Sequence, residues 1–187
     1  MATINGLSLK KIRTFTGHEG ECCYQGDLYL GNNKIGFWSQ DTHCGMDDLS
    51  MEDAYSEKKL QQAIMDLNKD KTTTYTASDG KTIDFHYDLS CLLYDWIKLH
   101  DAEKAFKKAI KNGYAGIIQI ESDYEVIIFT VDSRFLSASE TELKEILHKE
   151  WIKARCCCRK GEEPKIRKYQ SKDDFIVGEL IKEEDIM

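Results

Sequence analysis

Three consecutive β-type segments near the start of the chain constrain the fold more than any other feature. Leu7–Thr16, Cys22–Leu30 and Lys34–Gln40 alternate apolar with polar residues and contain β-branched and aromatic side chains. The sequence Gly31-Asn32-Asn33 between the last two is typical of a tight turn, because Gly and Asn both accept positive φ. A slip in the alternation near Lys10-Lys11 indicates a β-bulge. These segments predict an antiparallel three-stranded meander.

Three later segments have apolar residues at helical spacing. They are Ser56–Asn68, Leu89–Asn112 and Glu140–Cys156, and each would place its apolar residues along one stripe of a helix. Ser56 is expected to cap the first segment, because its hydroxyl can accept a hydrogen bond from a backbone N–H of the first turn. The segments therefore predict three helices.

Two further hairpins are predicted between these helices. Thr73–Ala77 with Lys81–Tyr87 is polar, whereas Tyr114–Glu121 with Tyr124–Val131 is rich in β-branched residues and is expected to supply central strands. A last strand is expected at Phe175–Val177. Because hairpins alternate with helices and strict βαβ repeats are missing, the predicted fold class is α+β.

The length of the chain fits one domain. A chain of 187 residues can bury an adequate core, so we expect a single α+β domain over residues 1–187, with a subdivision near residue 88 left open and a frayed acidic tail at 179–187. No apolar run reaches the roughly 20 residues that span a bilayer, and the first residues lack the order of a signal peptide. Adjacent cysteines such as Cys22-Cys23 do not suit a disulfide framework. The predicted location is therefore the cytoplasm.

Charge is unevenly distributed along a chain whose net charge is −7. Asp41–Glu57 contains six acidic residues and no Lys or Arg, whereas Lys153–Lys168 contains seven basic residues and two acidic ones. Such polarity can steer a charged partner, although solvated faces also carry charge runs. The part of this segment at Asp41–Asp53 is predicted to be a loop. It mixes carboxylates with apolar side chains, a combination that suits a protein surface that occupies a basic groove meant for nucleic acid. The basic tract could instead contact phosphates.

The candidate catalytic and metal-binding groups form no standard pattern. Five potential zinc ligands have a spacing that matches no known zinc motif: His18, Cys22, Cys23, His43 and Cys44. Cations around Cys156–Cys158 could lower a thiol pKa, but no His is close in sequence, and we interpret these thiols as packing groups. Alternation places Asp27 and Asp84 on solvated strand faces. No catalytic residue, metal or cofactor is assigned, and a non-enzymatic protein is preferred over an enzyme.

Four short motifs lie in the N-terminal part of the chain: Leu9-Lys-Lys-Ile, Tyr24-Gln-Gly-Asp-Leu-Tyr-Leu, Lys34-Ile-Gly-Phe-Trp-Ser-Gln-Asp and Cys44-Gly-Met-Asp-Asp. In these motifs the N-terminal part of the chain resembles small proteins carried by phages and mobile elements of gut gram-positive bacteria. That pool includes anti-CRISPR proteins, among them Cas9 inhibitors. The resemblance implies a phage protein that acts in the cytoplasm of a host cell, and it supplies no catalytic motif.

Three hypotheses of function follow. The first is a non-enzymatic binding protein that inhibits a nucleic-acid-processing enzyme of host defence, with a Cas nuclease or its guide-RNA complex as partner. Its predicted partner-binding residues are Asp41, Met46, Asp47, Asp48, Leu49, Glu52, Asp53 and Tyr55. The second is a nucleic-acid-binding accessory protein that uses Lys153, Arg155, Arg159, Lys160, Lys165, Arg167 and Lys168. The third is a thiol- or metal-dependent enzyme. Because exposed charges contribute little to stability, reversing the acids Asp47, Asp48, Glu52 and Asp53 is expected to leave folding nearly intact.

Overall fold

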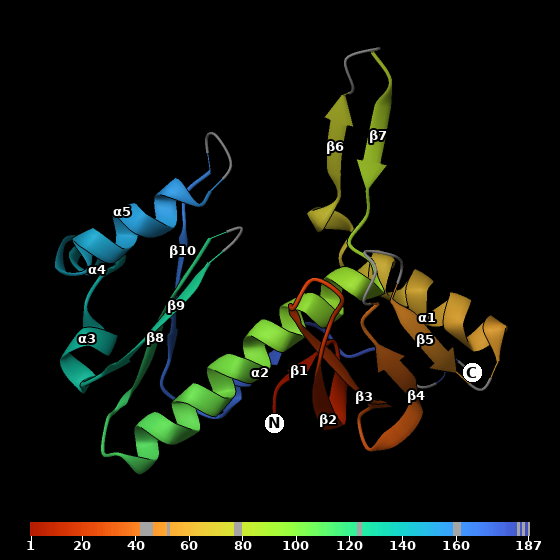
Figure 1. The fold of residues 1–187 in the computed structure, drawn as a ribbon, viewed down its shortest axis with the longest axis horizontal. Coiled ribbons are helices and arrows are strands. Elements are labelled where there is room, and N and C mark those ends of the chain that lie inside the picture. Colours follow the sequence, from red (N-terminus) through yellow and green to blue (C-terminus); the bar gives the residue numbers. More distant parts are fainter. Residues whose placement is uncertain are drawn as a thin grey trace. The chain divides into compact units, whose positions relative to one another are not determined.

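The structure is a computed structural model of the chain. It describes residues 1–187 except 42–46, 52, 77–79, 123–124, 159–161, 183, 185, 187 and the side chain of Tyr75. The described residues form helices and antiparallel strands, which confirms the predicted α+β class (Figure 1). They divide into two compact units. Thr3–Ile97 with Val177–Met187 is called the six-stranded unit, and Met1–Ala2 with Lys98–Ile176 is called the three-stranded unit.

The six-stranded unit is built on one sheet in the order β11-β1-β2-β3-β4-β5. The strands of this sheet are β1 (Thr3–Ile4), β2 (Leu7–Thr16), β3 (Cys22–Leu30), β4 (Asn33–Ser39), β5 (Asp48–Met51) and β11 (Ile176–Val177), and Val177 is the residue of β11 that belongs to this unit. The predicted meander is confirmed as β2-β3-β4. The predicted bulge is also present, because the β2–β3 register shifts between Lys10 and Arg13 and Lys11 has a φ of 51°.

Strand β5 lies inside the segment predicted to be an acidic loop, so that prediction is wrong for these four residues. Gly36 of β4 permits the close pairing, because a Cβ at this position would lie 2.7 Å from the carbonyl oxygen of Ser50. Leu49 lies opposite Trp38, which is almost completely buried. The pairing extends the predicted meander by one strand, and β5 becomes an edge of the sheet.

Helix α1 (Ala54–Leu67) follows β5 and confirms the first predicted helix. Its N-cap is Asp53 rather than Ser56, the predicted cap. The Asp53 carboxylate accepts hydrogen bonds from the backbone N–H groups of Tyr55 and Ser56, both at 2.8 Å. An aspartate in this position also interacts favourably with the helix dipole.

A two-stranded sheet is separate from the six-stranded one. In it β6 (Thr73–Thr76) pairs antiparallel with β7 (Thr82–Phe85), which confirms the predicted polar hairpin (Figure 1). The 3-10 turn η1 (Lys69–Lys71) precedes the hairpin, and helix α2 (Leu89–Lys111) follows it and confirms the longest predicted helix. The residues of α2 before Lys98 belong to the six-stranded unit, and the rest belong to the three-stranded unit.

Asn5, in the turn between β1 and β2, forms hydrogen bonds with the first residues of the C-terminal segment. The Asn5 N–H donates to the carbonyl oxygen of Val177, and its side-chain amide donates to that of Glu179, both at 2.8 Å. The Asn5 carbonyl oxygen accepts from the N–H of Ile181 at 3.0 Å. Asn5 is buried and has a φ of 52°, which Asn tolerates better than most residues.

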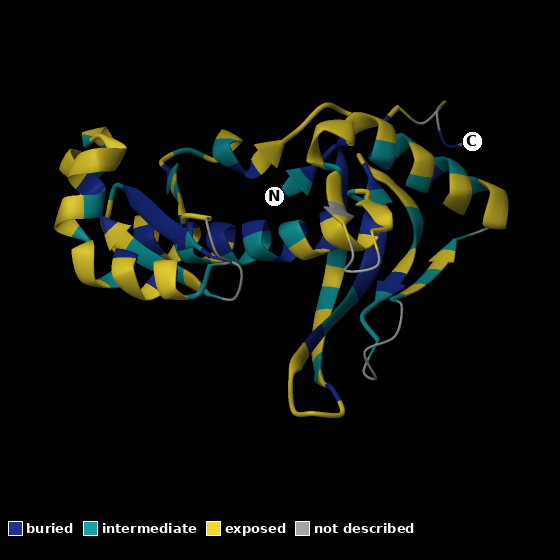
Figure 2. Cartoon of the chain, turned by 90° about the horizontal axis from the view of Figure 1, so that it is seen from above, coloured by how far each residue is buried: buried dark blue, intermediate teal, exposed yellow. Residues whose placement is uncertain are grey.

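The three-stranded unit has an antiparallel sheet in the order β10-β8-β9. Its strands are β8 (Gly116–Glu121), β9 (Val126–Val131) and β10 (Lys165–Tyr169). The predicted hairpin is β8–β9, and β8 is the central strand and is buried along most of its length (Figure 2). Strand β10 lies in the basic tract and was not predicted from the sequence. Tyr169 of β10 stacks on Phe175 in the turn η2 (Asp173–Phe175), with ring centroids 4.7 Å apart.

Three short helices pack on this sheet: α3 (Ser133–Ser137), α4 (Glu140–Ile146) and α5 (His148–Cys156). The prediction of one long helix over α4 and α5 is wrong, because the chain breaks at Leu147. Ile118 of β8 packs against Leu143, and Ile120 packs against Trp151. The break therefore lets α4 and α5 each bury their own side chains on the sheet.

Candidate partner-binding surface

The two units differ in charge. The six-stranded unit contains 19 acidic and 10 basic residues, a formal charge of −9. The three-stranded unit contains 14 acidic and 16 basic residues, a formal charge of +2, and the two values together give the −7 of the chain. The negative excess therefore belongs to the unit that holds the predicted partner-binding residues. A surface of one sign attracts partners of the opposite sign.

The predicted partner-binding residues lie around β5 and the start of α1. Asp48 is exposed at the first position of β5, and Leu49 beside it is half-buried. Tyr55, in the first turn of α1, exposes 66% of its surface. Asp41 and Asp47 are half-buried. Two of the predicted residues lie outside the described part of the chain: Met46 and Glu52.

Two of these carboxylates stabilise the fold. Asp47 accepts a 3.1 Å hydrogen bond from Nε1 of Trp38, whose ring is almost completely buried. Asp53 caps α1, and hydrogen bonds from the backbone and hydroxyl of Ser56 hold the pKa of Asp53 below its usual value. The premise that all the acids of this segment are dispensable for folding is therefore wrong for Asp47 and Asp53. Asp48, the acidic residue of β5, has an exposed side chain.

The β6–β7 hairpin has an exposed apolar face that was not predicted from the sequence. The register pairs Thr73 with Phe85 and Thr74 with Asp84, so the two faces of the ribbon differ. Ile83 and Phe85 lie two residues apart on β7, share one face, and expose 48% and 58% of their surface. The opposite face carries Thr74 and Asp84, joined by a 2.7 Å hydrogen bond. The ribbon is therefore amphipathic.

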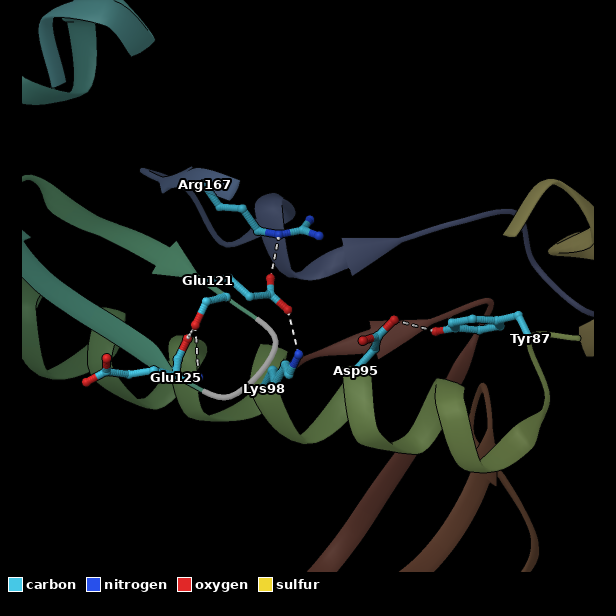
Figure 3. Close-up of polar contacts among 7 residues, drawn as sticks. Tyr87, Asp95, Lys98, Glu121, Glu125 and Arg167 are labelled. Carbon is cyan, nitrogen blue, oxygen red and sulfur yellow. Dashed lines mark hydrogen bonds and ion pairs between the residues drawn. The ribbon is translucent and has the colours of Figure 1, made fainter. Parts of the chain in front are cut away.

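The base of the hairpin is fixed to α2. The Tyr87 hydroxyl donates a 2.6 Å hydrogen bond to Asp95 (Figure 3). Nζ of Lys71 lies 3.9 Å from the centroid of the Tyr87 ring. Burial and the hydrogen bond to Asp95 raise the pKa of Tyr87, so the hydroxyl stays protonated, and a donor, beyond the pH at which an ordinary tyrosine ionises. Asp88 accepts a hydrogen bond from the N–H of Cys91 at 2.9 Å and fixes the start of the helix. The ribbon thus projects from a defined base.

Most described cations of the basic tract have acceptors within the chain. Lys153 forms an ion pair with Glu125, and Nε of Arg167 lies 3.3 Å from Glu121. Lys168 donates to two backbone carbonyl oxygens at the end of α3. A phosphate would have to compete with these contacts, which weakens the case for a nucleic-acid surface. The tract also includes the exposed residues Arg155 and Lys165. Its other two cations, Arg159 and Lys160, lie outside the residues that the structure describes.

Glu121, at the end of β8, is the centre of a charge network (Figure 3). Its carboxylate lies 2.6 Å from Nζ of Lys98 and 3.3 Å from Nε of Arg167. Burial alone would raise the pKa of Glu121, but the hydrogen bond and charge of Lys98, with those of Arg167, outweigh burial and lower it. A carboxylate held ionised by two cations is suited to stabilising the fold rather than to proton transfer.

Asp27 was predicted on a solvated face, and that prediction is wrong because the residue is buried in β3. Its carboxylate lies 2.6 Å from Nζ of Lys34 and 3.1 Å from Nζ of Lys11, the residue at the bulge. Hydrogen bonds from these two lysines lower the pKa of Asp27. Asp84 is exposed, as predicted. Asp27 is therefore an internal ion-pair partner.

The pKa is raised for two of the thiols. Burial raises the pKa of Cys23, and partial desolvation of the otherwise exposed Cys91 side chain raises its pKa too. His43 and Cys44 of the candidate zinc set lie outside the described residues. Among the residues that are described, no group of three or more His, Cys, Asp or Glu side chains is placed to hold a metal ion.

Comparison with protein-family models, with curated proteins and with solved structures finds no match to this chain. In the described part of the chain, no helix combines the length and the hydropathy needed to cross a membrane. The candidate site is therefore defined by geometry alone. It consists of the exposed residues of β5 and α1 and of the β6–β7 ribbon, all in the six-stranded unit.

Proposed function

We propose that this chain is a non-enzymatic binding protein that inhibits a nucleic-acid-processing enzyme of host defence, and that its target is a Cas nuclease bound to guide RNA. The observation that carries the proposal is the concentration of negative charge, −9, in the six-stranded unit. Grooves that hold nucleic acid are lined with cations, so an acidic protein surface competes for them.

Exposed elements of the same unit support the proposal. β5 is an edge strand, and its exposed residues Asp48 and Ser50 alternate with the half-buried Leu49 and Met51. An edge strand offers backbone donors and acceptors to a partner. Tyr55 adds an exposed aromatic side chain next to β5, and aromatic residues are frequent anchors of interfaces. The internal pairing of the basic tract favours a protein partner over a nucleic acid.

The test is DNA cleavage by a purified Cas9–guide RNA complex with increasing amounts of the chain. We expect cleavage to fall as the chain approaches the nuclease concentration, and to fall less at high salt because salt screens charge attraction. The variant Asp48→Lys/Glu57→Lys reverses two exposed acids and is expected to weaken inhibition about tenfold. Full inhibition by this variant would show that the acidic surface does not contribute to binding of the nuclease. Cleavage that no concentration of the chain reduces would contradict the nuclease target.

A gel-shift titration with DNA and with RNA separates the proposal from the nucleic-acid hypothesis. The proposal expects no complex between the free chain and either nucleic acid. An accessory protein would instead bind with an affinity that falls steeply with salt, and Arg155→Glu/Lys165→Glu would weaken that binding. Salt-dependent binding that this variant abolishes would favour the basic tract.

A further inference from the structure

We propose that the apolar face of the β6–β7 ribbon is the anchor by which the chain holds its protein target, inserted into an apolar pocket of the same basic surface that attracts the acidic unit. The inference rests on the proposed function for the class of partner, a protein with a basic surface. It adds the element that makes the central contact.

The apolar face is not explained by the fold of the chain itself. Every residue of β7 is exposed, and the ribbon forms a two-stranded sheet with no third strand among the described residues. An isolated two-stranded ribbon is marginally stable in water, and exposed apolar side chains stabilise it little. Yet Ile83 and Phe85 are both placed on the face opposite the Thr74–Asp84 hydrogen bond. This separation of apolar and polar faces is what a ribbon needs in order to cover an apolar surface on one side only.

The base of the ribbon is suited to presenting this face. The Tyr87–Asp95 hydrogen bond and the capping of α2 by Asp88 fix the chain immediately after β7. At the base of the ribbon, the hydroxyl of Thr72 before β6 lies 3.3 Å from Nδ1 of His86 after β7. A ribbon that projects from a fixed base loses less conformational freedom on binding than a free loop would.

Charge argues for a basic protein rather than a second copy of this chain. Each partner of a stable complex buries roughly 800 Å² of surface. The two side chains Ile83 and Phe85 supply only a small part of such an area, so the ribbon needs further contacts around it. In a two-fold dimer through this face those contacts would come from two units that each carry −9, and they would repel. A basic surface instead supplies the further contacts by attraction.

The test uses the full chain with the photo-crosslinking residue p-benzoylphenylalanine in place of Phe85. The matched control carries it in place of Thr82, on the opposite face of the same strand. Each protein is irradiated with the Cas9–guide RNA complex and, separately, in a lysate of a gram-positive host that carries a CRISPR system. Adducts are identified by mass spectrometry. Competitors are the unlabelled wild-type chain, Ile83→Thr/Phe85→Thr, and the control Thr76→Ser/Thr82→Ser.

We expect a crosslink to Cas9 from position 85 that exceeds the crosslink from position 82 by about tenfold. Wild type and Thr76→Ser/Thr82→Ser should compete equally, and Ile83→Thr/Phe85→Thr should compete about thirty-fold less well. If Cas9 is neither crosslinked nor inhibited, but position 85 captures a basic lysate protein with the same competition pattern, the anchor stands and the Cas target fails. Equal crosslinking from both positions, an adduct with a second copy of the chain, or no competable adduct in either mixture would overturn the anchor.

Discussion

The hairpins β6–β7 and β8–β9 have the same construction, an antiparallel pair of short strands, but opposite surroundings. In β8, Ile118 and Ile120 are fully buried against α4 and α5, and β10 pairs with the second edge of the strand. In β7, Ile83 and Phe85 are exposed, and no described strand pairs with the outer edges of the ribbon. The apolar residues of β8 are thus explained by the core of their own unit, whereas those of β7 are not.

The difference indicates which part of the molecule is built for stability and which is available to a partner. The three-stranded unit pairs its charges internally, as at Glu121, and is close to neutral. The six-stranded unit carries the excess of negative charge and the exposed apolar ribbon. Substitutions in the first unit should therefore change unfolding, and substitutions in the ribbon should change binding.

The largest expected difference comes from one isoleucine in each hairpin. Ile118→Ala removes buried methyl groups from the core and should lower the free energy of unfolding by about 2–5 kcal/mol. Ile83→Ala removes methyl groups from the exposed face of the ribbon and should change the free energy of unfolding by less than about 0.5 kcal/mol. Urea denaturation followed by circular dichroism measures both. Equal losses of unfolding free energy in the two variants would mean that the ribbon is part of a core, and would contradict the contrast between the two hairpins.

A smaller effect is expected at Glu121, and it depends on pH. Glu121→Gln removes the negative charge that contacts Lys98 and Arg167 and should lower the free energy of unfolding by about 1–3 kcal/mol at neutral pH. The pKa of Glu121 is lowered in the folded protein, so its contribution is complete above the ordinary value of 4.5 and is lost as pH falls through the folded value. Thermal melts should therefore show the wild type and the variant converging in acid.

The matched control for Glu121 is Asp84→Asn on the exposed ribbon. It should leave the melting temperature nearly unchanged at every pH, because exposed charges contribute little to stability. A gap between wild type and Glu121→Gln that stays constant down to acid pH would show that the network does not depend on an ionised carboxylate.

The smallest effect separates two acids of the predicted partner-binding segment. Asp53→Ala removes the N-cap of α1 and should lower the free energy of unfolding by about 1 kcal/mol. Asp48→Ala removes an exposed charge and should change it by less than about 0.5 kcal/mol. Chemical denaturation distinguishes the two. A larger loss for Asp48→Ala would show that β5, rather than the cap, stabilises this segment.

The sequence predicts the elements whose pattern is local. The meander, the β6–β7 and β8–β9 hairpins and α2 follow from alternation or helical spacing, and each is confirmed within a few residues. β5 was missed because the acidic residues of the surrounding segment suggested a loop, although Asp48–Met51 alternates exposed with half-buried residues. β10 was missed because its lysines and arginine looked like a solvated tract, whereas pairing with β8 places them at an edge strand. Both misses depend on a strand partner that lies elsewhere in the chain.

The candidate site was predicted only in part. The acidic segment was identified from composition, but the roles of Asp47 and Asp53 depend on the distant Trp38 and on the register at which α1 begins. The ribbon's apolar face had a local signal, because Asp84 alternates with Ile83 and Phe85. What the sequence could not supply is the exposure of that face, since exposure is set by the absence of a covering element among the described residues.

Amide hydrogen exchange of the chain, alone and bound to the Cas9–guide RNA complex, tests the central claim most directly. In the free chain, exchange should be fast in the described strands 73–76 and 82–85 and slow in 116–121, because of these strands only 116–121 is covered by packed helices. On binding, protection should increase at 48–55 and 73–85, while 153–168 stays unchanged. Protection confined to 153–168, or no change at 73–85 in a complex that inhibits cleavage, would contradict the account.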